Sequence, residues 1–215
     1  AGVVPMGTTG ESATLNTHEH LEVISRTIEV ANGRISVVAG TGSNSTEETL
    51  HQTKEAESLG ADACLLVTPY YNRPTQEGLY AHFKKIAETT SVPLVLYNVP
   101  GRTGCDLLPE TIGRLSSIEG IVGIKEASGK IERVSEIRSV SASDFFILSG
   151  EDALTLEMMN NGAVGTISVT ANVLPKAMAE FCDSFLSGNI KRASAIDEVL
   201  QSVHEILFIE SNPTP

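Results

Sequence analysis

The chain has 215 residues, of which 41% are hydrophobic and 20% charged, as expected of a globular domain with a sizeable core. No apolar run reaches the ~20 residues needed to cross a membrane, and no basic, apolar leader is recognisable, so we expect a soluble cytoplasmic protein. The formal net charge of −12 excludes a typical nucleic-acid binder, because that role requires clustered Lys and Arg.

Short β-rich runs alternate with longer segments of helical periodicity along the chain. The predicted strands are residues 3–6, 35–38, 64–67, 94–97, 121–124, 145–148 and 163–167. Asn16, with Glu19 three residues later, marks the start of the first helix. Further helices are predicted at about 45–60 and 76–88, near 109, 131 and 153, from Pro175 to about 188, and at 190–209.

This alternation predicts parallel strands joined by right-handed crossovers, in either an open doubly wound sheet or a closed barrel. The loop from Gly7 to Ser12 contains neither a dinucleotide nor a P-loop fingerprint, which disfavours the open sheet. The sequence starts without Met, inside a predicted strand, and only seven strands are found. We therefore expect an α/β protein with a (β/α)8 TIM barrel that lacks its first strand and helix.

Lys125 follows the apolar run 121–124 directly, where the chain leaves a predicted strand. An amine at the mouth of a core is desolvated, which lowers its pKa and leaves part of it neutral and nucleophilic. Such an amine can form a Schiff base with a carbonyl compound. A lysine at a strand end can also extend its charged group outward into solvent.

Residues that follow the strands of a barrel converge on one mouth, where such enzymes carry their chemistry. Hydroxyls, phenols, small residues and one amine occupy these positions: Thr8, Thr9, Gly40, Thr41, Gly42, Thr68, Tyr70, Tyr71, Tyr97, Asn98, Lys125, Ser149, Gly150, Glu151, Ile167 and Ser168. His18 and His20 have no third ligand nearby in the sequence, and the three cysteines lack a CxxC spacing. The pattern therefore predicts no metal site.

Six segments in chain order, GTTGESATL, GTGSNST, TPYYNRPTQEGLYAHF, LYNVPGRTG, GIKEASG and GAVGTISV, resemble the pyruvate-dependent Schiff-base lyases, also called the N-acetylneuraminate lyase family. The resemblance runs from the first residue to the last. It implies a barrel that begins before Ala1 and a helical extension that continues past Pro215. Residues 1–188 would form the incomplete barrel, and residues 189–215 the beginning of the C-terminal helical region.

The resemblance also assigns roles to residues, without any cofactor. Lys125 would attack the ketone of pyruvate, and the iminium would lose a proton to give an enamine that attacks an aldehyde. Protons would be relayed by Tyr97, Thr8 and Tyr71. Thr9 and nearby amides would bind the pyruvate carboxylate, with Gly150 and Ile167 lining the cavity. From the residues alone, Tyr97 could equally be a core aromatic, and Thr8 and Thr9 could be ordinary turn residues.

Arg102 distinguishes among members of this family. A guanidinium after the strand that bears Tyr97 can hold a second carboxylate bidentately. The resemblance therefore implies condensation of pyruvate with L-aspartate 4-semialdehyde to the cyclic 4-hydroxy-tetrahydrodipicolinate, the first committed step towards diaminopimelate and lysine. The alternatives are another pyruvate-dependent lyase acting on sialic acid or a sugar acid, and a non-catalytic sensor of a keto acid or lysine.

The resemblance implies an oligomer as well, because Tyr71 would cross into a neighbouring subunit's site in a homotetramer built as a dimer of dimers. It also implies L-lysine as an inhibitor, bound by positions matching Ser12, Ala13, His20, Asn44, Glu48 and Tyr70. Glu48 could instead serve only as a first-turn acid of its helix. Thr17 stands where the family often has histidine. No nucleic acid or membrane partner is implied.

Overall fold

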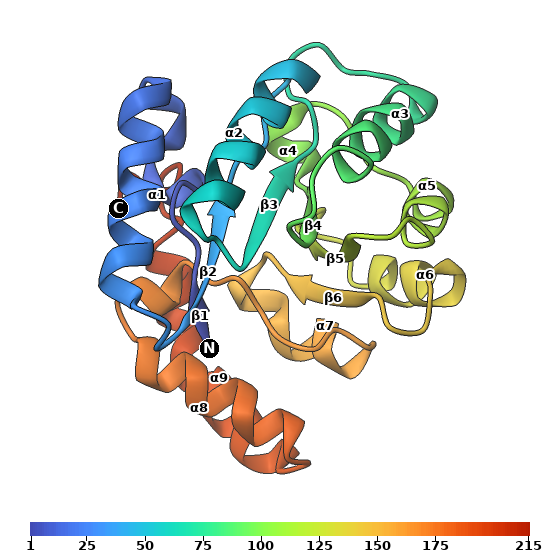
Figure 1. The fold of residues 1–215 in the computed structure, drawn as a ribbon. Coiled ribbons are helices and arrows are strands. Elements are labelled where there is room, and N and C mark those ends of the chain that lie inside the picture. Colours follow the sequence, from blue (N-terminus) through green and yellow to red (C-terminus); the bar gives the residue numbers. More distant parts are fainter.

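The computed structural model describes all residues from 1 to 215 and arranges them around one curved parallel sheet (Figure 1). The sheet has six strands in the order of the sequence: β1 (Gly2–Val3), β2 (Ser36–Gly40), β3 (Ala63–Val67), β4 (Leu94–Asn98), β5 (Ile121–Glu126) and β6 (Phe146–Ser149). Every neighbouring pair is parallel. The strands form a half-barrel, so their carboxyl ends share one rim.

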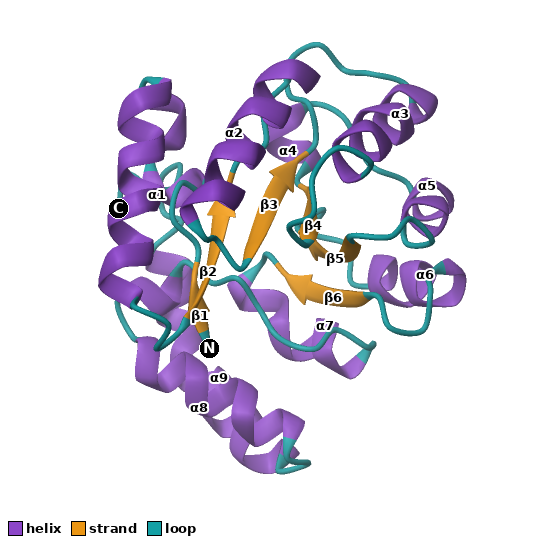
Figure 2. Ribbon diagram, viewed as in Figure 1, coloured by secondary structure: helices purple, strands orange, loops and turns teal.

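Helices follow the strands and cover the outer face of the sheet (Figure 2). They are α1 (Thr17–Ala31), α2 (Thr46–Leu59), α3 (Gln76–Ala87), α4 (Pro100–Thr103), α5 (Pro109–Leu115), α6 (Glu132–Val140), α7 (Thr155–Asn160), α8 (Pro175–Leu186) and α9 (Ile190–Ile206). The predicted alternation of strand and helix is thus confirmed. None of these helices is both long and apolar enough to span a lipid bilayer.

Two predicted strands are shortened in the structure, whereas β5 extends two residues further than predicted and includes Lys125. The first was expected over 3–6 but covers only Gly2–Val3, since Met6 takes a left-handed backbone conformation with φ of 58°. The seventh, expected over 163–167, is reduced to an isolated bridge between Ser149 and Thr166. Its backbone still hydrogen-bonds to β6 on one side, but Gly165, with φ of 156°, bends the segment away from regular strand geometry.

The helix starts that the sequence marked are where they were expected. The Asn16 side chain accepts hydrogen bonds from the backbone of His18 and Glu19, and the Glu19 carboxylate accepts one from the Asn16 backbone. This reciprocal capping box satisfies donors that the first turn of α1 would otherwise leave free. The short helix α4, which carries Arg102, was not predicted, because a single turn has no measurable periodicity.

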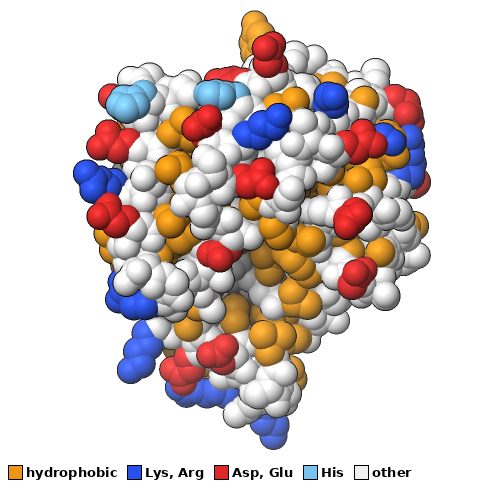
Figure 3. Space-filling model, in the orientation of Figure 1, with side chains coloured by type: hydrophobic (Ala, Val, Ile, Leu, Met, Phe, Trp, Pro, Cys, Tyr) orange, Lys and Arg blue, Asp and Glu red, His pale blue; other side chains and the backbone are white.

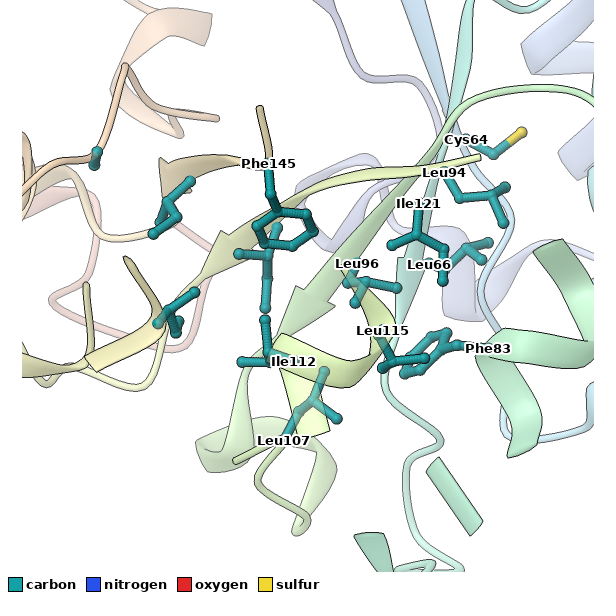
Figure 4. Close-up of a cluster of buried hydrophobic side chains, with 14 of the residues drawn as sticks. Cys64, Leu66, Phe83, Leu94, Leu96, Leu107, Ile112, Leu115, Ile121 and Phe145 are labelled. Atoms are coloured by element: carbon teal, nitrogen blue, oxygen red, sulfur yellow. The ribbon is translucent and has the colours of Figure 1, made fainter. Parts of the chain in front are cut away.

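Side chains alternate across the sheet and build two apolar layers. The larger layer lies between the strands and the outer helices and includes Leu66, Leu96 and Phe83 (Figure 4). Ile124 belongs to the same layer. The smaller layer lines the inside of the half-barrel and consists of Leu65, Val95, Tyr97, Val99 and Ala127. Successive residues of a strand therefore face, in turn, the inside of the barrel and the helices.

The surface is mixed in character. Acidic and basic side chains are interspersed with apolar ones over the face shown in Figure 3. This distribution agrees with the acidic composition of the chain and shows no continuous basic stripe on that face.

Candidate active site

Lys125 and Tyr97 face each other on neighbouring strands inside the half-barrel. Their Cα atoms are register partners in the pairing of β4 with β5. The Lys125 ammonium nitrogen lies 4.2 Å from the centre of the Tyr97 ring. Since both residues are the penultimate residues of their strands, the amine and the phenol lie together at the carboxyl rim of the sheet.

Burial changes the protonation of Lys125. Desolvation lowers its pKa from 10.5 to about 8, and the positive charge of Arg102 adds to this effect. The negative charges of Asp152 and Glu151 oppose it. At pH 7 roughly a tenth of the amine is then neutral, against far less than 1% for an ordinary lysine. The site holds a nucleophilic amine at physiological pH.

Tyr97 keeps its proton. Burial raises the pKa of the phenol, while the nearby Thr8 side chain and the charge of Arg102 act in the other direction. Thr8 begins a 3-10 turn, Thr8–Gly10, just after β1. The structure thus brings Lys125, Tyr97 and Thr8 together, with a neutral phenol able to donate and accept protons between them.

Thr9 and Arg102 are linked through a distant part of the chain. The Asn212 amide donates a hydrogen bond to the Thr9 hydroxyl at 2.9 Å. Arg102 Nη2 donates to the Asn212 carbonyl at 3.0 Å. A hollow of about 720 Å³ is bordered by Arg102 and the segment from Phe208 to Asn212. Sequence reasoning missed Asn212, because nothing local marks a contact across more than two hundred residues.

Gly150 follows β6 and lies against Lys125. A Cβ atom at Gly150 would be 2.9 Å from Cε of Lys125 and 2.7 Å from the Cβ of Ala127. The Gly150 backbone N–H donates to the Glu126 carbonyl at 2.8 Å, which fixes its position. Ile167 packs against the inner apolar layer that contains Tyr97. Gly150 therefore lies beside Lys125, and Ile167 beside the apolar layer that contains Tyr97.

Two acidic residues lie beside Lys125: Glu151 was expected at this rim without an assigned role, and Asp152 was not predicted. Burial raises the pKa of Glu151, and the Lys125 charge acts to lower it. Asp152 is 4% exposed and accepts hydrogen bonds from the backbone of Val169 and Thr170, both at 2.8 Å. Their position directly after Gly150 was the available signal, since it places them at the same rim of the sheet.

Tyr71 lies apart from the other predicted catalytic residues. Its side chain is 90% exposed, and its φ of 73° lies in the left-handed region. Its backbone N–H donates to the Thr103 carbonyl at 3.1 Å, so the loop is tied to α4 while the phenol extends into solvent. Within one chain the structure does not bring Tyr71 to Lys125.

Three of the residues predicted to bind lysine, His20, Asn44 and Glu48, lie at or beside the loop after β2. The His20 ring is buried and hydrogen-bonds to the Gly40 carbonyl at 2.7 Å. The Glu48 carboxylate accepts a hydrogen bond from Ser43, and the Asn44 carbonyl accepts one from Asn72. Ser12 and Ala13 lie in a 3-10 turn before α1, and Tyr70 is 41% exposed beside Tyr71.

Comparison with known proteins shows which family the whole chain matches. The model of the dihydrodipicolinate synthetase family matches residues 1–215. The chain is 55% identical to 4-hydroxy-tetrahydrodipicolinate synthase of Stutzerimonas stutzeri over 213 residues, which are 99% of this chain and 73% of that protein.

Solved structures give the same picture. The chloride-inhibited dihydrodipicolinate synthase of Acinetobacter baumannii, complexed with pyruvate, superposes with a TM-score of 0.96 and 51% identity, covering 99% of this chain and 73% of that one. The enzyme of Cyanidioschyzon merolae with lysine bound superposes with a TM-score of 0.95 and 40% identity, covering 99% and 72%.

The lowered pKa of Lys125 predicts its reactivity with pH. Reductive methylation requires the neutral amine, so the initial rate at Lys125 should rise with a midpoint near pH 8 and level off above it. Peptide mass spectrometry after short exposure to formaldehyde and cyanoborohydride resolves this lysine from the others. A lysine-containing model peptide is the control and should keep gaining rate towards pH 10. A midpoint near 10 at Lys125 would contradict the desolvated site.

The contact of Gly150 with Lys125 predicts the effect of one added methyl group. Gly150→Ala should displace the lysine stem and lower the methylation rate of Lys125 at pH 8 by about tenfold or more, because the glycine backbone cannot retreat. Gly101→Ala is the matched control, since its Cβ would meet no atom within 4 Å. Thermal melts establish that both variants are folded. Equal labelling of Gly150→Ala and the parent would show that the contact does not hold Lys125.

Proposed function

The chain belongs to the dihydrodipicolinate synthetase family, and we propose that it acts as a 4-hydroxy-tetrahydrodipicolinate synthase. The reaction condenses pyruvate with L-aspartate 4-semialdehyde to give 4-hydroxy-tetrahydrodipicolinate, the first committed step of diaminopimelate and lysine biosynthesis. The observation that carries this proposal is the desolvated amine of Lys125 against Tyr97, in a chain 55% identical to such a synthase over 99% of its length.

The reaction begins with the neutral amine of Lys125. It attacks the keto carbon of pyruvate to give a carbinolamine, which takes up a proton on oxygen and loses water to leave an iminium. Tyr97 and Thr8 pass the protons between nitrogen and oxygen, because the phenol keeps its proton and interacts with the Thr8 hydroxyl. The negative charges of Glu151 and Asp152 favour the cationic iminium.

Carbon–carbon bond formation follows. The iminium loses a proton from the pyruvate methyl carbon, and the resulting enamine attacks the aldehyde carbon of L-aspartate 4-semialdehyde. The alkoxide takes up a proton. The amine of the former aldehyde substrate then attacks the iminium carbon, which closes the ring and releases Lys125. Arg102 binds the carboxylate of this second substrate, and Thr9 with neighbouring amides binds that of pyruvate.

Assembly supplies the third hydroxyl of the relay. We infer that Tyr71 enters the site of a neighbouring subunit in a homodimer or a tetramer of two such dimers. The 90% exposure of its side chain on a loop tied to α4 supports this inference. A phenol that is solvent-exposed in one chain and becomes buried against a partner is the kind of residue that interfaces favour.

The half-barrel has one open side, between β1 and the segment that pairs with β6. One further parallel strand and its helix at this position would complete a (β/α)8 barrel of which residues 1–188 are the larger part. Residues 189–215, with α9, would then begin a C-terminal helical region. The supporting observation is that β1 pairs with β2 alone and its other edge has no strand partner.

Trapping with borohydride tests the proposed chemistry. Pyruvate plus borohydride should label Lys125, located by peptide mass spectrometry, and Lys125→Ala should lose both the label and nearly all activity, a fall of ~10³-fold or more. Consumption of L-aspartate 4-semialdehyde distinguishes the synthase from a sialic-acid or sugar-acid lyase. Labelling without turnover of any aldehyde would indicate a keto-acid sensor, and absence of the label would exclude the mechanism.

We further propose that L-lysine inhibits the enzyme at the loop after β2. A relative from Cyanidioschyzon merolae has been solved with lysine bound, and Glu48 offers a carboxylate to the ligand's ammonium group beside Ser43. Activity should fall in lysine of millimolar order, and Glu48→Gln should weaken inhibition by about tenfold. Glu47→Gln, on the same first turn of α2, is the matched control. Unchanged activity in lysine would refute the proposal.

A further inference from the structure

Behind the reactive pair lies a second polar pair on the opposite face of the sheet. Asn98 and Glu126 immediately follow Tyr97 and Lys125, and their Cα atoms are register partners one step further along β4 and β5. Because side chains alternate, they face the helices, on the same side as Leu96 and Ile124. Both residues are fully buried, with 0% exposure.

Both N–H donors and the carbonyl oxygen of the Asn98 amide are hydrogen-bonded. Its Nδ2 donates to Glu126 Oε2 at 3.1 Å and to Asp106 Oδ1 at 2.9 Å. Its Oδ1 accepts from the Leu107 backbone at 3.0 Å. The amide thus joins the two strands to each other and holds the loop that runs from Arg102 towards α5.

Glu126 anchors the other side of the pair. Its Oε1 accepts a hydrogen bond from the Ser128 backbone at 2.6 Å, which fixes the chain directly after Lys125. Burial raises the pKa of this carboxyl, whereas Ser128, Asn98 and the charge of Arg133 favour its ionised form. As both Glu126 oxygens face donors, the carboxylate form is the one that fits the surrounding hydrogen bonds.

Arg133 from α6 closes the network. Its two terminal nitrogens bind the two oxygens of Asp106 at 2.9 and 3.0 Å, a bidentate pair. Its side chain is only 5% exposed, against 28% for Asp106. The burial pattern and the bonds show a connected set, Asn98, Asp106, Glu126 and Arg133, that joins two strands, one loop and one helix.

The polar character of this pair is informative. Apolar side chains fill the preceding positions on the same face, Leu96 and Ile124, and an apolar pair at the next position would avoid desolvating a carboxylate. Hydrogen bonds add what apolar contacts lack, which is a fixed direction and distance. A misplacement of about 1 Å at a reacting group can cost on the order of 100-fold in rate.

We propose that Asn98 and Glu126 are positioning residues for the lysine Schiff base: their hydrogen bond, one step beyond Tyr97 and Lys125 on the opposite face, sets the amine and phenol against each other, and Asn98 anchors the loop that follows α4, the helix that carries Arg102. The proposal deepens the function proposed above and rests on it. Neither residue touches the substrates, since both side chains point away from the inside of the half-barrel.

An exchange of hydrogen-bonding roles tests the proposal. Asn98→Asp removes both donors and places a third carboxylate beside Glu126 and Asp106, so kcat should fall by ~100-fold, with a smaller change in KM. Glu126→Gln is nearly isosteric, but its Nε2 group would face either the Asn98 amide or the Ser128 backbone N–H, both of which are donors. One hydrogen bond is then lost, and kcat should fall by ~10-fold. The double variant restores the bond in the reverse direction without changing net charge. It should regain about tenfold or more over Asn98→Asp.

Thr53→Val is the control for simple destabilisation. It removes a buried hydrogen bond between the hydroxyls of Thr53 and Thr41, 2.9 Å long, with little change in volume. Its melting temperature should fall while kcat stays within twofold of the parent. The rate of pyruvate trapping at Lys125 is measured for all variants, because it reports the amine without the second substrate.

The outcomes separate this inference from the proposed function. A parent protein that forms no pyruvate adduct rejects the function. If the parent reacts, and folded Glu126→Gln and Asn98→Asp keep trapping rates and kcat within twofold of it, the positioning role is rejected. Losses that simply multiply in the double variant also reject it, because coupling is then absent. If Asn98→Asp does not fold, Glu126→Gln and the double variant decide the question.

Discussion

The removal of one amine from water governs the site. A solvent-exposed Lys125 would be almost entirely protonated at neutral pH, and its nitrogen would have no lone pair to offer. Burial inside the half-barrel lowers its pKa from 10.5 to about 8, a cost in folding free energy on the order of 3 kcal/mol below that pH. The cost disappears as pH rises through the interval between the two values. The fold therefore sacrifices some stability at neutral pH for a reactive nitrogen.

Side chains alternate between the two faces of a strand, so one segment can supply both the reactive groups and the contacts that hold them. On β4 and β5 the inward residues Tyr97 and Lys125 carry the reactive groups, while the next residues, Asn98 and Glu126, turn to the helix side and bond to each other. The inner face needs a space for substrate and the outer face needs a filled, rigid contact. A parallel sheet with helices on one side provides both faces within two residues of chain.

The sequence predicts the part of this arrangement that depends on local pattern. Periodicity predicts the strands, and the convergence of parallel strand ends predicts that Lys125, Tyr97 and Thr8 lie at one rim. Asn212, Asp106 and Arg133 escaped prediction, because their roles arise from contacts between segments with no shared local signal. The seventh strand was predicted to be longer than it is. The segment pairs only with β6, and the backbone conformation of Gly165 interrupts a regular ladder of hydrogen bonds. Tyr71 is a different case, because its predicted role requires a second chain.

The charges around Lys125 act in opposite senses at different stages of the reaction. Before the Schiff base forms, the positive charge of Arg102 and burial both favour a neutral amine, and Glu151 and Asp152 oppose them. Once the iminium exists, its nitrogen carries a positive charge, so Arg102 favours loss of the N–H proton to the neutral imine, whereas the two acids stabilise the cation. A carboxylate bound to Arg102 weakens that repulsion. Binding of an aldehyde that bears a carboxylate thus stabilises the iminium from which the reacting enamine forms, whereas an aldehyde without one leaves the guanidinium charge unopposed.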